Sequence, residues 1–200
     1  MKMHKAPGNV LPREAMISVR EHTMAPVLTV YDVLSNVTGR LRWGGAEAAV
    51  LLSVEAPEGQ LTVGSEFTST AEVRIWRLRD SSVITEAIRP LRFECVTDST
   101  VEQTKNGATA DWLLVHHYDI SEHGHQGDIS YTCRLISATG LPGALTILRF
   151  PVLRSLATYV WARASRSGLR RLIAAAETMA QGEPVPVKEK EEDHGKAVDK

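Results

Sequence analysis

Three polar side chains in two apolar segments could do chemistry in an enclosed site. His116 and Tyr118 stand in phase with Leu114 and Ile120 in LLVHHYDI, and Tyr131 holds the corresponding phase in DISYTCRL. Successive side chains of a strand point to opposite faces, so we expect all three on the inward face. An imidazole and two phenols there could act as acid and base on an enolisable carbonyl. Buried His and Tyr also commonly only hydrogen-bond each other or the backbone, so both roles stay open.

Arg77 is a fourth candidate, as the partner of a ligand carboxylate or enolate. Residues 64–78 (GSEFTSTAEVRIWRL) have the composition of one long strand, in which Arg77 shares the face of Val73 and Ile75. On that face the guanidinium would reach inward. The alternative is that Arg77 lies at a strand end, in a charged rim with Glu72 and Asp80, and pairs with exposed acids.

Several histidines between residues 116 and 125 raise the question of a metal site. His116 and His117 point to opposite faces of a strand, and His123 and His125 lie in the polar loop SEHGHQG. No cysteine or carboxylate spacing supports a metal centre. The chain also lacks the P-loop, GxGxxG, HExxH and GxSxG motifs. We therefore expect neither a metal nor another cofactor.

The two cysteines, Cys95 and Cys133, lie in segments with a strand pattern. Neither belongs to a CxxC pair, which argues against a zinc knuckle or a redox dithiol. Free cysteine behaves as a small buried apolar residue. We predict two buried thiols, with a disulfide between adjacent strands as the alternative.

Composition and charge narrow the class of protein. The 200 residues are 43% hydrophobic and 24% charged, and 23 Lys and Arg against 24 Asp and Glu give a formal net charge of -1. A general nucleic-acid binder needs a basic excess, so no nucleic-acid partner is expected. The N-terminus lacks the apolar segment of a secretory signal, and no stretch approaches the ~20 apolar residues of a membrane span. We expect a cytoplasmic protein without a transmembrane segment.

The elements that would position these side chains begin with a strand from Met16 and a helix over 27–37 that follows Pro26. Strand patterns then occupy residues 46–55, 64–78, 83–88, 91–97, 112–120 and 128–136. The dipeptide Asn106-Gly107 predicts a hairpin, because both residues tolerate positive φ. An antiparallel sheet with helices gathered on one side is an α+β fold.

A long helix is predicted from Pro151 to about residue 179. One buried face is indicated by apolar residues at three- and four-residue steps: Leu153, Ala157, Val160, Trp161, Ala164, Gly168, Leu172 and Ala175. This helix must cover the concave face of the sheet, and space left between them would form a ligand cavity. We divide the chain into a flexible arm (1–14), one ligand-binding domain (15–181) and a disordered charged tail (182–200).

The order of these elements and five phrases resemble the START-like, or SRPBCC, superfamily over about residues 16–180. The phrases are VGSEF (63–67), ITEAIRPLRFEC (84–95), LLVHHYDI (113–120), DISYTCRL (128–135) and RFPVLRSL to LRRLIAAAE (149–177). The resemblance implies a helix-grip fold, in which a curved antiparallel sheet wraps around a long C-terminal helix with an internal cavity. The chain departs at 38–50 (TGRLRWGGAEAAV), which is rich in Gly and Ala where relatives often carry a second short helix with a Trp. Trp43 would hold that place.

This superfamily includes lipid-transfer domains and polyketide cyclase/dehydrase families, and fold alone does not choose between them. The first hypothesis is a binder of a small hydrophobic molecule of the lipid, polyketide or isoprenoid type. The second is a polyketide cyclase, aromatase or dehydratase that uses His116, Tyr118, Tyr131 or Arg77. A third is an interaction module whose interior is filled by side chains. The expected cavity residues are Phe67, Val73, Ile75, Phe93, Cys95, Trp112, His116, Tyr118 and Tyr131, closed by Leu153, Leu156 and Val160.

Overall fold

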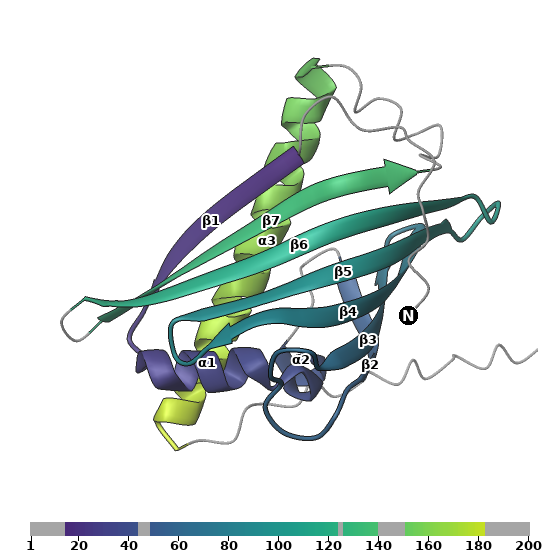
Figure 1. Ribbon diagram of the computed structural model, residues 1–200. Helices are drawn as coiled ribbons and strands as arrows, with labels where there is room; N and C mark the ends of the chain where they lie inside the picture. The colour runs from purple at the N-terminus through teal and green to yellow at the C-terminus, as the bar shows by residue number, and fades with distance from the viewer. Residues whose placement is uncertain (1–14, 44–48, 124–125, 140–150, 183–200) are drawn as a thin grey trace, which may run out of the picture.

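The structure is a computed structural model that describes residues 15–43, 49–123, 126–139 and 151–182 (Figure 1). The predicted arm at 1–14 and, apart from Gly182, the predicted tail at 182–200 lie outside these residues.

The centre of the fold is a seven-stranded antiparallel sheet in the order β1-β7-β6-β5-β4-β3-β2. Every pair of neighbours except β1 and β7 is consecutive in the sequence. The first strand returns to pair with the last, from Ala15 opposite Leu135 to Thr23 opposite Gly127. The strands are β1 (Ala15–Thr23), β2 (Ala49–Glu55), β3 (Glu66–Val73), β4 (Trp76–Ile88), β5 (Arg92–Gln103), β6 (Thr109–His123) and β7 (Gln126–Thr139).

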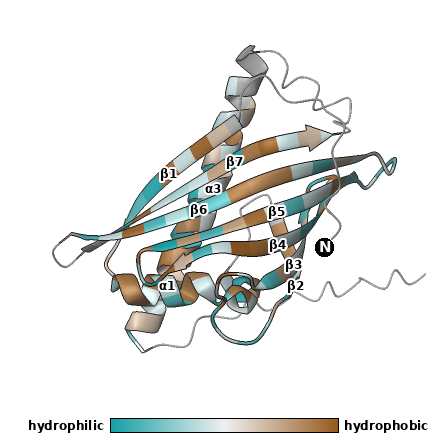
Figure 2. Cartoon of the chain, in the orientation of Figure 1, coloured by the Kyte–Doolittle hydropathy of each residue, from teal (hydrophilic) through white to brown (hydrophobic). Residues whose placement is uncertain are grey.

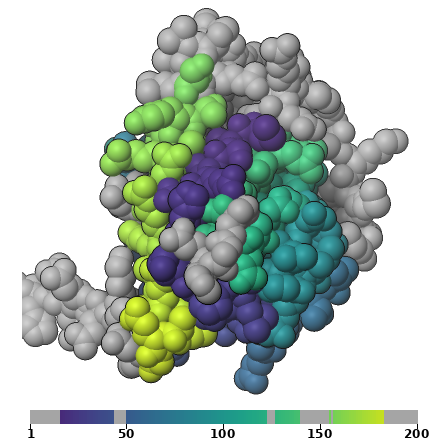
Figure 3. Space-filling model, turned by 90° about the vertical axis from the view of Figure 1, so that its left-hand side faces the viewer, coloured from purple at the N-terminus to yellow at the C-terminus, as the bar shows by residue number. Residues whose placement is uncertain are grey.

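The helices gather on the concave side of this curved sheet, as the α+β prediction requires (Figure 1). They are α1 (Val27–Ser35), the 3-10 helix η1 (Val37–Gly39), α2 (Arg40–Trp43) and the long α3 (Pro151–Ala180). The helix α3 contacts α1, α2 and β1, and the space-filling view shows it running beside β1 (Figure 3). The predicted helix-grip fold is confirmed. None of the helices in the described part of the chain has an apolar run long enough to span a bilayer.

Polar contacts hold the C-terminal half of α3 to β1. Arg166 and Arg170 both pair with Glu21, at 3.2 and 3.3 Å. Glu177 accepts hydrogen bonds from the Thr23 hydroxyl and from the Met24 backbone N–H, at 3.2 and 2.9 Å. The end of β1 is therefore fixed to the helix by side chains as well as by packing.

The core lies between the inner face of the sheet, α1 and the C-terminal half of α3. Phe93 and Ile129 on the sheet, Leu34 on α1 and Leu172 on α3 are at most 2% exposed. Apolar and polar residues alternate along the strands, which is the pattern of a sheet with one buried face (Figure 2). The ring of Tyr31 meets that of Phe93 edge to face at 6.1 Å.

The prediction of one strand over 64–78 is wrong, because the chain turns at Arg74 and Ile75 between β3 and β4. Val73 and Trp76 are paired across this two-residue turn, and Arg74 takes a φ of 55°. Such turns require positive φ and usually contain Gly or Asn, so the residues there give no turn signal. Paired residues lie on the same face of a sheet, so Trp76 joins Val73 on the inner face. The faces of Trp76, Arg77 and Leu78 are thereby reversed relative to the prediction.

The hairpin predicted at Asn106-Gly107 is confirmed. Gly107 has a φ of 68° in the β5–β6 turn, where its N–H donates to the carbonyl of Gln103 at 2.9 Å. The cysteines lie on β5 and β7 as buried free thiols, as predicted. The central strand β6 separates them, since His116 is paired with both.

The predicted buried face of α3 is confirmed at Leu172 and Ala175 and wrong at Val160, which is 58% exposed. At 3.6 residues per turn, the 12 residues from Val160 to Leu172 rotate the side-chain direction by about 120° relative to whole turns. Apolar residues spaced by four therefore drift around the helix, away from the buried face that contains Leu169, Leu172 and Ala176. The side chains of Leu153 and Leu156 lie outside the described set.

The orientation of α3 predicts that shortening a buried side chain and an exposed one will lower the free energy of unfolding by different amounts. Leu172→Ala should lower the free energy of unfolding by about 2–5 kcal/mol, because it leaves a cavity against the sheet. Val160→Ala should change it by less than about 0.5 kcal/mol, because the side chain is exposed. Urea unfolding of both variants would measure the difference, and equal losses would contradict the phase.

Candidate ligand-binding site

The central strands bring the predicted polar residues together on the inner face of the sheet. His116 on β6 is paired with Cys95 on β5 and Cys133 on β7. Tyr118 forms the next row, between Phe93 and Tyr131. The alternation along β6 and β7 was sufficient to predict this, since neither segment is interrupted between these residues.

His116 and Tyr131 form the closest polar pair of this group. The Nδ1 atom of His116 lies 2.7 Å from the Tyr131 hydroxyl oxygen. The Tyr118 ring lies 4.7 Å from the Tyr131 ring, measured between centroids. The three side chains thus pack as one unit, with a hydrogen bond that satisfies two of their polar atoms.

Burial keeps this unit uncharged at neutral pH. Burial, and to a smaller extent the positive charge of Arg40, lower the pKa of His116 to about 4. Burial raises the pKa of Tyr118 to about 12 and that of Tyr131 well above its ordinary value of 10.0. The imidazole is therefore neutral at pH 7 and both phenols keep their protons.

Arg40, at the start of α2, is a site residue that the sequence analysis missed. Its guanidinium carbon lies 5.5 Å from the centroid of the Phe67 ring on β3. The guanidinium charge also acts on Tyr118 and Cys95, so it faces the inner side of the sheet. Its Nε and Nη2 atoms are buried and have no hydrogen-bond partner. The sequence carried no signal for it: residues two apart on a helix point to different sides, but only the packing of α2 decides which of Arg40 and Arg42 faces the sheet.

A second polar row crosses the inner face two rows beyond His116. It runs in register from Ser69 through Asp80 and Ser99 to Trp112. Asp80 Oδ1, Ser99 Oγ and Trp112 Nε1 are buried without hydrogen-bond partners. Burial raises the pKa of Asp80, and the serines on either side only partly oppose this. The expectation that Asp80 belongs to an outer rim is wrong, because the turn at residues 74–75 reverses the phase of β4.

The remaining predicted lining residues divide into two groups. Phe67, Phe93 and Cys95 are buried on the inner face, and Val73 is half-buried there. Ile75 instead lies in the β3–β4 turn with 37% of its surface exposed, so it does not line the inner face.

Arg77 lies on the outer face of the sheet. Its Nη2 and Nε atoms donate to Glu72 Oε1 at 2.6 and 3.0 Å. The expectation that Arg77 reaches inward is wrong, and the alternative, a rim pair with an acid, is confirmed. The cause is again the turn that separates Arg77 from the phase of Val73.

The outer face also carries a charged network. His117 lies between Glu94 and Asp119, at 3.0 Å from a carboxylate oxygen of each. Glu86, Glu94 and His117 offer ligand atoms within 4.8 Å of one another, a spacing that could hold a metal ion. Arg92 pairs with Glu86 and Asp119 at 3.2 and 3.1 Å, so a guanidinium already balances much of this negative charge.

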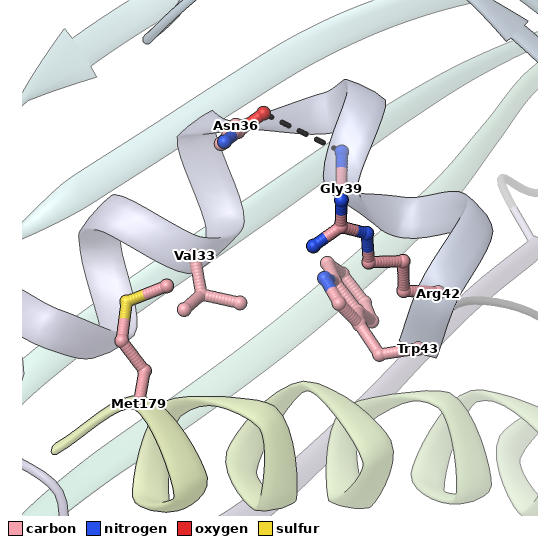
Figure 4. Close-up of a pocket in the computed structure, with 6 residues that line it drawn as sticks. All are labelled: Val33, Asn36, Gly39, Arg42, Trp43 and Met179. Carbon is pink, nitrogen blue, oxygen red and sulfur yellow. Dashed lines mark hydrogen bonds between the residues drawn. The ribbon is translucent and has the colours of Figure 1, made fainter. Parts of the chain in front are cut away.

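A small pocket opens between α1, α2 and the end of α3 (Figure 4). Its volume is about 80 Å³, well below the roughly 300 Å³ at which ligand pockets begin. The Asn36 side chain accepts a hydrogen bond from the Gly39 N–H at 3.4 Å on its wall. The lining residues are Val33, Asn36, Gly39, Arg42, Trp43 and Met179.

The sequence matches no protein-family model and no curated protein. Solved structures share the fold, with a curved antiparallel sheet and one C-terminal helix. A protein of Chromobacterium violaceum is 16% identical, with 82% of this chain and 97% of that chain covered and a TM-score of 0.52. An uncharacterized protein of Rhizobium leguminosarum is 11% identical (82% and 95% covered, TM-score 0.55), and a protein of Nitrosomonas europaea is 12% identical (82% and 96%, TM-score 0.55). At these identities the likeness shows the fold alone.

The lowered pKa of His116 predicts a pH dependence of stability. Between pH 6.5 and pH 4 the unfolded chain binds a proton at this residue and the folded chain does not. As the pH is lowered from 6.5 to 4, the free energy of unfolding should therefore decrease, by up to about 3 kcal/mol from this group. His116→Gln removes the titrating group, so the difference between wild type and variant should shrink as the pH falls.

Urea unfolding at pH 7 and pH 4.5 would measure both proteins. An identical pH dependence in wild type and His116→Gln would show that the imidazole is not desolvated in the folded state.

Proposed function

We propose that the protein binds a small, largely apolar molecule between the sheet and α3, in the manner of START-like proteins. The observation that carries this proposal concerns His116, Tyr118 and Trp112, which are only half-buried at the centre of the inner face. Burial is nevertheless the main cause of the pKa shifts of His116 and Tyr118. Side chains that are shielded from bulk water and still keep some accessible surface are expected where they line an internal cavity.

The unpaired polar atoms of the inner face support the same proposal. Folded proteins leave few buried donors and acceptors without a partner. Here Arg40, Asp80, Ser99 and Trp112 all have such atoms, and all four belong to the interior side of the fold. Ligand pockets typically combine an apolar wall with a few polar groups of this kind. Phe67, Phe93, Leu114 and Leu135 supply the apolar part.

The electrostatics favour binding over acid–base catalysis. An efficient general base has a pKa near the working pH. With a pKa of about 4 against an ordinary 6.5, His116 is a base weakened by roughly two to three powers of ten. Tyr118 and Tyr131 are weakened as acids, since their pKa values are raised. The unit suits the recognition of a hydroxyl or carbonyl better than proton transfer.

A polyketide cyclase, aromatase or dehydratase remains the second candidate. The observation in its favour is the 2.7 Å contact between His116 and Tyr131, which joins two polar groups at one point of the inner face. Catalysis would require bound substrate to raise the pKa of His116 toward neutrality. If the protein transforms its ligand, turnover should rise with pH around the pKa of His116 and be lost in His116→Gln, whereas a carrier returns the ligand unchanged.

We further propose that this binding takes place in the cytoplasm. Cys95 and Cys133 are free thiols, and disulfides are rare in that compartment.

The binding proposal predicts that filling the interior abolishes uptake of an apolar probe. His116 and His117 are neighbours on β6 with side chains on opposite faces, so they give matched positions. His116→Trp adds bulk inside and should weaken binding of N-phenyl-1-naphthylamine at least about tenfold. His117→Trp adds the same bulk outside and should leave binding within about twofold. Probe fluorescence would measure the affinity, and circular dichroism the fold.

Native mass spectrometry of the purified protein would identify a natural passenger. A stoichiometric apolar molecule released on denaturation supports the proposal. A protein that carries no passenger and takes up no probe would instead be an interaction module with a filled interior.

A further inference from the structure

We propose that the ligand carries an acidic group, such as a carboxylate, and that the Nε and Nη2 edge of Arg40 binds it. This inference rests on the proposed function and names the class of ligand: an amphipathic organic anion.

The first step is the cost of shielding part of a charged group from water, because Arg40 is half-buried and its Nε and Nη2 atoms are buried. A guanidinium stays protonated at every physiological pH and can only donate hydrogen bonds. Removing such a charge from water without a partner is strongly unfavourable. The ring of Phe67 offers Arg40 a weak cation–π contact, but it satisfies none of the N–H donors. Nε and Nη2 are thus left with unmet hydrogen-bonding capacity.

The same protein shows what that edge of an arginine binds. In Arg89, Nε and Nη2 donate to the two carboxylate oxygens of Asp32, at 3.0 and 2.9 Å. This two-bond geometry is the preferred way for arginine to hold a carboxylate or a phosphate. In Arg40 the same two atoms, Nε and Nη2, have no carboxylate oxygen to donate to.

No acid of the described residues fills that place. Asp80 is the acid on the inner face, but its carboxylate oxygen Oδ2 accepts from Ser69 at 3.4 Å, and Oδ1 has no partner. Its pKa is raised by burial, whereas a guanidinium in contact would lower it. The described side chains therefore leave the positive charge of Arg40 uncompensated.

The neighbours of Arg40 on the inner face are neutral, so its charge dominates the local field. Its charge reaches His116, Tyr118 and Cys95, and burial keeps all three in their uncharged forms at pH 7. An anion would gain from this field, a neutral ligand would gain little, and a cation would be repelled. The apolar remainder of the ligand would lie against Phe67 and Phe93.

Two fluorescent probes with one skeleton test the inference on the full chain. The compound 1-anilinonaphthalene-8-sulfonate is N-phenyl-1-naphthylamine with an added sulfonate. The wild type should bind the sulfonate at least about tenfold more tightly than the neutral probe, as expected for charge-assisted hydrogen bonds. Arg40→Met should remove that preference and leave binding of the neutral probe within about threefold. Arg40→Lys keeps the charge and should keep part of the preference.

Arg42→Met is the matched control, because Arg42 lies on the same short helix and is exposed. It should leave both affinities unchanged. Equal binding of the two probes by the wild type, or equal weakening of both in Arg40→Met, would overturn the inference while the apolar site stands. A wild type that binds neither probe would instead overturn the proposed function itself. Displacement by dodecanoate but not by dodecanol would extend the result from a sulfonate to a carboxylate.

Discussion

The antiparallel register of β3 to β7 is the constraint on which the interior depends. Residues paired across such strands lie on one face, so each row of the register carries its side chains to the same side. One row brings His116 between the two cysteines, and the next brings Tyr118 between Phe93 and Tyr131. A change of phase in one strand would move all its inward side chains to solvent.

Charged groups are paired on the outer face of the sheet, whereas burial favours the neutral forms of titratable groups on the inner face. On the outer face, Arg92, Glu86, Glu94, His117 and Asp119 form a hydrated network in which each charge has a partner. On the inner face, burial shifts His116, Tyr118 and Tyr131 toward their neutral forms. Arg40 is the exception, because a guanidinium cannot escape its charge by losing a proton. A permanent positive charge beside neutral groups and apolar rings suits an apolar molecule with an acidic end.

The helices hold this interior from one side. The helix α3 contacts β1, α1 and α2, and Leu169, Leu172 and Ile173 in its C-terminal half are buried. Toward the N-terminal half, Tyr159 and Val160 are more than half exposed. Among its described side chains, the fully buried ones thus lie in the C-terminal half, and α3 also contacts α1. Asp80, Ser99 and Trp112, each with a buried polar atom that lacks a hydrogen-bond partner, lie on the inner face of the sheet.

The sequence by itself determined the α+β class, the hairpin at Asn106-Gly107, the long terminal helix and the inward phase of β6 and β7. Those features follow from local periodicity and turn chemistry, which depend only on residues close together in the sequence. Only the tertiary structure decided the phase of β4, because the turn at Arg74 and Ile75 contains neither Gly nor Asn. It also decided which side of α3 is buried, because a helix with apolar residues on several sides takes its orientation from what packs against it. The sequence did not reveal Arg40 for the same reason: the surroundings of this short helix decide that Arg40 is half-buried and Arg42 exposed.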